Sequence, residues 1–75
     1  MNQYSRERIA QNIKKYRTEK CLKREELSLS LGFDNSYISK LERGTINITI
    51  DKLEKIADFF EVDVSNLLQI NEEYK

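Results

Sequence analysis

Few of the side chains that usually perform catalysis occur in this sequence. The 75 residues include no histidine and one cysteine, Cys21, so a histidine-assisted nucleophile and a cysteine–histidine zinc site both lack their residues. Two glycines are too few for a phosphate-binding glycine-rich loop. The acid pairs Glu25–Glu26 and Glu72–Glu73 are adjacent and point apart, which does not suit acid–base catalysis. We therefore predict a protein that is not an enzyme and for which no metal ion, cofactor or small-molecule ligand is evident.

The charges of the chain balance overall but are divided unevenly along it. Residues 1–43 carry ten Lys and Arg against six acids, whereas residues 44–75 carry three Lys against seven acids. A polyanion responds to the charge of the face that it meets, and not to the sum over the chain. The first part is therefore suited to face phosphate groups, and the second part to face a partner or solvent.

Length and hydropathy indicate one soluble domain over residues 1–75, with a frayed tail at 71–75. The lone Cys21 excludes a disulfide within the chain. Residues 1–11 lack the apolar run of a signal peptide, and no apolar stretch is long enough to cross a membrane. We therefore expect an intracellular protein.

Apolar residues recur at helical spacing along most of the chain, and proline is absent. We predict five helices, whose ends are marked by capping residues and glycines. They cover residues 5–20 with Ser5 as N-cap, residues 24–31 before Gly32, a segment from the N-cap Asp34 to Gly44, a segment capped by Thr49, and a short segment that starts at Asp63 or Ser65. Between the third and fourth helices, Ile46–Ile50 alternates apolar and polar residues. A single strand would leave its edges unpaired, so we predict an extended loop that buries Ile48, with Ile46 as a second candidate.

Residues 24–43 have the spacing of two helices joined by a tight turn. Ser28 is small enough to lie where the two helices cross, and Gly32 tolerates the positive φ of the turn. Ile38 and Leu41 then face inward from the second helix. This is the spacing of the helix-turn-helix motif, whose second helix enters the major groove of DNA.

Two further segments, YISKLERG at residues 37–44 and IDKLEKIA at residues 50–57, extend the pattern. Over about residues 6–69 the chain resembles the lambda-repressor/Cro type of helix-turn-helix domain, the XRE family. Its short format is most similar to restriction–modification controller proteins and small phage repressors. The resemblance implies an all-α, compact five-helix lambda-repressor-like domain, encoded by a bacterium or a phage and located in the cytoplasm on the nucleoid.

The resemblance also implies roles for single residues. Asn35, Ser36 and Lys40 match positions that usually reach base edges, and Ser39 flanks them. Their chemistry suits this role, because Asn can pair with adenine, Lys can donate to guanine and Ser can serve either. The residues that match contacts with the DNA backbone are Arg24, Tyr37, Arg43, Thr45 and Asn47.

Arg17 and Glu42 match a pair of opposite charges that ties the first helix to the end of the recognition helix. Two positions depart from the family pattern. Cys21 stands where the family often has Gly after the first helix, so either the backbone differs there or the domain tolerates a strained positive φ. We expect Cys21 to be a packing residue, buried or half-buried, with a redox-sensing thiol as the alternative. Lys23 replaces the Ser or Thr that commonly caps the second helix, so we expect a weaker cap.

The fourth and fifth helices, about residues 49–69, are predicted to serve both the core and a dimer contact. Apolar residues in excess of a core stripe are the candidates for that contact: Phe59, Val62, Val64, Leu67, Leu68 and Ile70.

The resemblance implies a sequence-specific regulator of transcription that binds double-stranded DNA as a homodimer on a palindromic operator, with autoregulation as a further possibility. Such a dimer would exclude RNA polymerase from a promoter or recruit it from an adjacent site. The alternative is an antitoxin-like or adaptor module whose DNA binding depends on a protein partner held by the acidic half.

Overall fold

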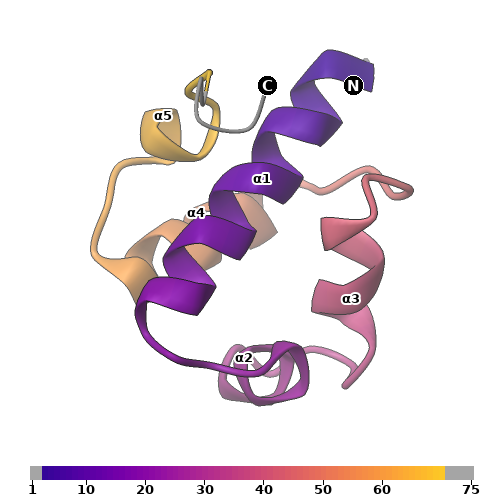
Figure 1. The fold of residues 1–75 in the computed structure, drawn as a ribbon, viewed down its shortest axis with the longest axis vertical. Coiled ribbons are helices and arrows are strands. Elements are labelled where there is room, and N and C mark those ends of the chain that lie inside the picture. The colour runs from indigo at the N-terminus through magenta and orange to yellow at the C-terminus, as the bar shows by residue number, and fades with distance from the viewer. Residues whose placement is uncertain (1–2, 71–75) are drawn as a thin grey trace.

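A computed structural model describes residues 3–70 of the chain, except for the side chain of Gln3. Five α-helices follow one another: α1 (Gln3–Glu19), α2 (Arg24–Ser30), α3 (Tyr37–Glu42), α4 (Ile50–Phe60) and α5 (Val64–Leu67). The described residues form no strand. Figure 1 shows α1 crossing the molecule in front of α4, with α3 to one side and with α2 and α5 towards opposite ends. The predicted all-α, five-helix fold is confirmed, and the tail predicted at 71–75 lies outside the described residues.

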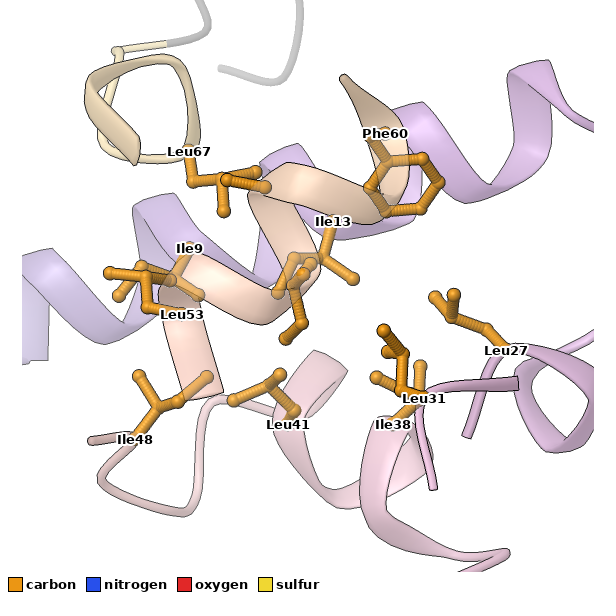
Figure 2. Close-up of a cluster of buried hydrophobic side chains, with 12 residues drawn as sticks. Ile9, Ile13, Leu27, Leu31, Ile38, Leu41, Ile48, Leu53, Phe60 and Leu67 are labelled. Carbon is orange, nitrogen blue, oxygen red and sulfur yellow. The ribbon is translucent and has the colours of Figure 1, made fainter. Parts of the chain in front are cut away.

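One apolar core receives side chains from all five helices. Figure 2 shows these side chains converging between α1, α3 and α4, with Leu27 entering from α2, Leu31 from just after α2 and Leu67 from α5. The loop after α3 contributes Ile48, which is 6% exposed, and Ile46 packs partly buried against the core, as predicted. Burying a side chain of this size contributes about 1.5–3 kcal/mol. The core therefore fixes how α3 is presented on the surface.

Two helices begin at residues other than those predicted. α1 begins at Gln3, so Ser5 lies inside the helix and is not its N-cap. α3 begins at Tyr37 with Ser36 as N-cap residue, two residues later than the predicted N-cap Asp34. The physical reason is local competition, because the Asp34 carboxylate accepts hydrogen bonds from the Ser36 hydroxyl at 2.6 Å and the Ser36 amide at 3.3 Å. These bonds hold a turn ahead of the helix.

The N-termini of the other helices follow the predicted signals more closely. The Thr49 hydroxyl accepts a hydrogen bond from the Lys52 amide at 3.2 Å and caps α4. Asp63, one of two predicted starts, is the N-cap residue of α5. Lys23 makes no side-chain cap for α2, as expected, but its own N–H donates to the Glu26 carboxylate at 2.8 Å.

Three helices end in the same left-handed turn. After α1, α2 and α4, the residue with positive φ is Cys21 at 57°, Gly32 at 76° and Glu61 at 58°. In each case the next amide returns to a carbonyl five residues earlier, as Leu22 does to Arg17 at 3.1 Å. This is the Schellman arrangement, in which the residue after the left-handed one packs on the helix. Leu22 therefore packs on the core and leaves Cys21 exposed, so the expected burial of Cys21 is wrong.

A buried amide joins the first helix to the last. Asn12 is 2% exposed, and its Nδ2 donates to the carbonyls of Leu67 and Gln69, each at 2.9 Å. These bonds occupy backbone acceptors at the end of α5 that the short helix leaves without intrahelical partners. Asn12 thereby fixes the position of α5 against α1.

Among residues 3–70, no helix is both long enough and apolar enough to cross a membrane.

Candidate nucleic-acid interface

A serine hydroxyl holds α2 and α3 at their crossing. Ser28 is wholly buried, and its Oγ accepts a hydrogen bond from the Ile38 amide at 3.1 Å while it donates to the Arg24 carbonyl at 3.0 Å. The Ile38 amide is one of the first N–H groups of α3, which have no partner inside that helix. Ser36, the N-cap residue of α3, makes no side-chain cap. Ser28 therefore caps α3 from a neighbouring helix.

Two arginines hold the opposite end of α3 through one carboxylate. Arg17 of α1 is 8% exposed, and its Nε and Nη2 donate to the two oxygens of Glu42 at 2.7 and 3.2 Å. Its remaining nitrogen, Nη1, donates to the Leu22 carbonyl at 2.7 Å. The structure thus places the predicted partners Arg17 and Glu42 in a bidentate ion pair that joins α1 to α3.

Arg24, which was predicted to contact the DNA backbone, is the second arginine on Glu42. Its Nε lies 2.9 Å from Glu42 Oε1, and its side chain is 49% exposed while that of Glu42 is 4% exposed. The prediction from sequence contained no such pairing. Arg24 and Glu42 are 18 positions apart with a turn between them, so no helical spacing relates the two positions.

The residues predicted to read bases lie in α3 and in the turn that precedes it. Asn35 is exposed and Ser36 half-buried in the turn ahead of the helix, while Ser39 is half-buried and Lys40 exposed within it. Ser36 differs from the other three because its hydroxyl already donates to Asp34. That bond lowers the pKa of the Asp34 carboxyl below its ordinary value.

The residues predicted to contact the DNA backbone surround these positions. Arg43 follows α3 directly and is exposed, as are Thr45 and Asn47 in the next loop. The Thr45 hydroxyl donates to the Lys40 carbonyl at 3.1 Å, which ties the loop to the helix end. Tyr37 is half-buried, and desolvation raises the pKa of its phenol, so the hydroxyl stays protonated and able to donate.

Two lysines of α4 lie over the aromatic residues at the start of α3. The Lys52 ammonium is 4.8 Å from the centre of the Tyr37 ring and 5.8 Å from that of Phe33. The Lys55 ammonium is 5.4 Å from the Phe33 ring, and the two rings are 4.8 Å apart. The part of the chain expected to be acidic therefore places two cations beside the helix-turn-helix motif.

A depression of about 500 Å³ opens between α1, α2 and α3. Its lining, which we call the cationic cleft, consists of Lys14, Arg24, Ser39, Glu42 and Arg43. Three of these residues were predicted DNA contacts, and the structure brings them together. Lys14 was not among the predicted site residues, and its place in α1, three residues before Arg17, is the only signal in the sequence that relates it to them.

The predicted dimer residues fall into different environments. Leu67 is wholly buried inside the protomer, so its assignment to a surface contact is wrong, because α5 needs its one inward side chain for the core. Three others are half-buried and pack against the core: Phe59, Val62 and Val64. Leu68 and Ile70 are 38% and 64% exposed, and they remain the predicted residues with most surface to offer.

Comparison with known proteins identifies relatives of this arrangement. The helix-turn-helix family model HTH_3 matches residues 13–67. The chain is 39% identical over 66 residues to the transcriptional regulator SinR of Bacillus licheniformis, covering 87% of this chain and 60% of SinR. It is 33% identical over 61 residues to the control protein C.BamHI of Bacillus amyloliquefaciens, covering 80% of this chain and 75% of that protein. The two SinR proteins and the Neisseria transcription factor that the chain matches are longer than the matched region, which spans 55–60% of their length.

Solved structures give the same grouping. A hypothetical transcription factor from Neisseria superposes with a TM-score of 0.86 at 33% identity, covering 93% of this chain and 80% of that one. SinR in complex with DNA superposes with a TM-score of 0.74 at 40% identity, covering 81% and 98% of the two chains. The restriction–modification controller C.Esp1396I superposes with a TM-score of 0.74 at 29% identity, covering 93% and 100%. Because the helix-turn-helix family model matches residues 13–67, most of the sequence, the chain belongs to the helix-turn-helix family.

Proposed function

We propose that this chain is a sequence-specific regulator of transcription that binds double-stranded DNA and has no catalytic activity. The observation that carries the proposal is the presentation of α3, which Ser28 and Glu42 hold at its two ends while polar side chains in the helix and in the turn before it stay accessible. Similarity to SinR, which was solved in complex with DNA, supports DNA binding by this chain. Such a protein acts in the cytoplasm, where bacterial DNA lies.

In this proposal α3 enters the major groove with its N-terminal end foremost. Asn35, Lys40 and Ser39 read base edges, with Ser36 the least available because its hydroxyl is engaged. The DNA backbone is contacted by the cations and donors around the helix: Arg24, Tyr37, Arg43, Thr45 and Asn47.

We further propose that the protein acts as a homodimer on a palindromic operator and regulates its own gene. Leu68 and Ile70 are exposed apolar residues that follow directly after α5, and a twofold contact there would pair two α3 helices for two half-sites. A dimer bound over a promoter would block RNA polymerase, and one bound just upstream would be placed to recruit it.

Fluorescence anisotropy with the DNA upstream of the protein's own gene, compared with random DNA at several salt concentrations, tests these proposals. Binding that survives excess random competitor, with two chains per site, is the expected result. Equal and weak binding to both DNAs, lost together as salt rises, would leave only the charge attraction and would refute sequence-specific regulation.

One observation favours a second candidate function, a module that needs a protein partner. Among the described residues, the α4–α5 region carries five exposed acids against two lysines, Lys52 and Lys55. The acids are Asp51, Glu54, Asp58, Glu61 and Asp63. A basic partner on this surface would neutralise charge that opposes DNA binding, so specific binding would appear only after the partner is added.

A further inference from the structure

We propose that Asp34 fixes the hydroxyl of Ser36 as a hydrogen-bond acceptor, and that Ser36 therefore selects a base that carries an amino group in the major groove. The inference rests on the proposed function and adds to it a positioning residue, Asp34, and the class of base that one reader accepts. A serine hydroxyl can ordinarily donate or accept, so the residue type alone leaves the class of base open. The neighbour of this serine removes one of these two roles.

The hydrogen bond between the two side chains has a defined direction. The Ser36 Oγ lies 2.6 Å from the Asp34 Oδ2, and the Ser36 amide nitrogen lies 3.3 Å from the same oxygen. Both bonds lower the pKa of the Asp34 carboxyl, so at neutral pH it is ionised and has no hydrogen to give. The hydrogen in the short bond is therefore the one on Ser36. A bond of this length to a charged oxygen is about twice as strong as a neutral one, so a base carbonyl does not displace it.

The lone pairs of the Ser36 oxygen remain for a partner. Ser36 is half-buried and its neighbours Asp34 and Asn35 are exposed, so the pair lies at the surface, in the turn that leads into α3. In the major groove, adenine N6 and cytosine N4 donate hydrogens, whereas guanine and thymine present acceptors. A hydroxyl that only accepts thus favours adenine or cytosine on the strand that it faces, and disfavours guanine or thymine there.

Ser39 provides a contrast within the same surface. It is also half-buried and lies three residues further along, inside α3. Among residues 3–70 no group accepts the hydrogen of its hydroxyl, so this hydroxyl can turn to donate or to accept. We therefore expect Ser39 to tolerate either class of base. A preference that depends on Asp34 should occur at the base pair of Ser36 and not at that of Ser39.

The first test uses the duplex upstream of the protein's own gene and a set of duplexes in which single base pairs are inverted. Inversion exchanges A with T, or C with G, and so moves the amino group to the other strand without a change in composition. The parent protein should lose about fivefold in affinity when the pair that Ser36 faces is inverted, because a base carbonyl then meets a lone pair. Ser36→Ala should abolish the loss at that pair and thereby identify it.

Asp34→Ala and Asp34→Asn separate the orientation of the hydroxyl from the charge of the carboxylate. Both variants remove one negative charge near DNA and should strengthen binding to all duplexes alike. Asparagine keeps an acceptor oxygen for the amide and hydroxyl of Ser36, so the fivefold preference should stay. Alanine leaves the Ser36 hydrogen free to donate, so the preference should fall below about twofold at that pair. The pair that responds to Ser39→Ala should show the same affinities ratio in all of these variants.

The outcomes separate this inference from the proposed function. Each comparison is a ratio between two duplexes for one variant, so a loss of folded protein lowers both affinities alike and leaves the ratio unchanged. A preference that survives Asp34→Ala, or a parent preference for guanine or thymine at this pair, would overturn the inference and leave sequence-specific binding intact. A parent protein that binds all the duplexes equally would refute sequence-specific binding itself.

A measurement without DNA checks the bond between the two side chains. The pKa of the Asp34 carboxyl, followed by NMR of its carboxyl carbon, should rise towards its ordinary value in Ser36→Ala, because the hydroxyl that lowers it most is removed. Ser39→Ala is the matched control and should leave this pKa in place. An unchanged pKa in Ser36→Ala would mean that the hydroxyl is not committed to Asp34, and the inference would fail.

Discussion

The two ends of α3 are held by different chemistry. At the C-terminal end, the Glu42 carboxylate is 4% exposed and receives two arginines, at 2.7 and 2.9 Å. At the N-terminal end, one neutral hydrogen bond of 3.1 Å joins the Ile38 amide to Ser28, and the N-cap hydroxyl of Ser36 is turned to Asp34. One end is anchored by buried charge, while the other is held by neutral hydrogen bonds and by the Lys52 ammonium over the Tyr37 ring.

This difference agrees with two separate roles along α3, contact with DNA bases and attachment of the helix to the rest of the protein. Side chains that read bases must keep donors and acceptors exposed, so they cannot also fasten the helix to the protein. Asn35 and Lys40 are exposed accordingly, and the fastening comes from residues on other helices. Changes at the anchored end should therefore affect folding most, and changes at the exposed end should affect the choice of DNA sequence.

Loss of charge at the anchored end has the largest expected effect. Glu42→Gln leaves the guanidinium of Arg17 buried with neutral acceptors alone, the Leu22 carbonyl and the amide oxygen of the substituted side chain. We expect the free energy of unfolding, measured by urea denaturation, to fall by about 3 kcal/mol. Glu54→Gln, which removes an exposed acid from α4, should change it by less than about 0.5 kcal/mol. Similar losses for both variants would mean that the ion pair does not hold α3.

Removal of the hydroxyl that caps α3 should have the next largest effect. Ser28→Ala keeps the packing but leaves the buried Ile38 amide without its acceptor, at a cost of about 2 kcal/mol in unfolding free energy. The Ile38 amide should also exchange its hydrogen faster. Ser30→Ala, at an exposed position of α2, is the control. Unchanged protection of Ile38 in Ser28→Ala would show that another group caps the helix.

Substitution of an exposed reader should change DNA preference without changing stability. Asn35→Ala should reduce discrimination between specific and random DNA by about 1 kcal/mol, with unfolding unchanged, because the side chain is exposed. Arg43→Ala should instead weaken binding to both DNAs alike, since a contact with the backbone carries no sequence information. If Asn35→Ala also weakens both equally, Asn35 contacts the backbone and does not read bases.

The helices and the core were predictable from sequence because their signals are local. Apolar spacing located the residues that face inward, and Gly32 and Gly44 marked turns with φ of 76° and 70°. The burial of Ile48 was predictable in the same way, from the alternation of apolar and polar residues around it. In each case the deciding information lies within about one helical turn of the residue concerned.

The parts that sequence did not predict depend on partners far along the chain. Asn12 is buried because carbonyls 55 and 57 residues away accept its hydrogen bonds, and no pattern around it signals this. Arg24 turns to Glu42 only because α1 has already brought that carboxylate inside. The late start of α3 has a local cause, but the hydroxyl of Ser36 could bond either forward to its helix or back to Asp34.

The smallest expected effect concerns the support that α4 gives to the N-terminal end of α3. Lys52 places its ammonium 4.8 Å from the Tyr37 ring, an attraction worth about 0.5–1 kcal/mol at an exposed site. Lys52→Ala should lower the unfolding free energy by about 0.5 kcal/mol, and Lys52→Arg should restore it, because a guanidinium also binds ring faces. An equal loss in both variants would mean that the cation–ring contact contributes nothing. The exposed end of α3 would then depend on Ser28 and the apolar core alone.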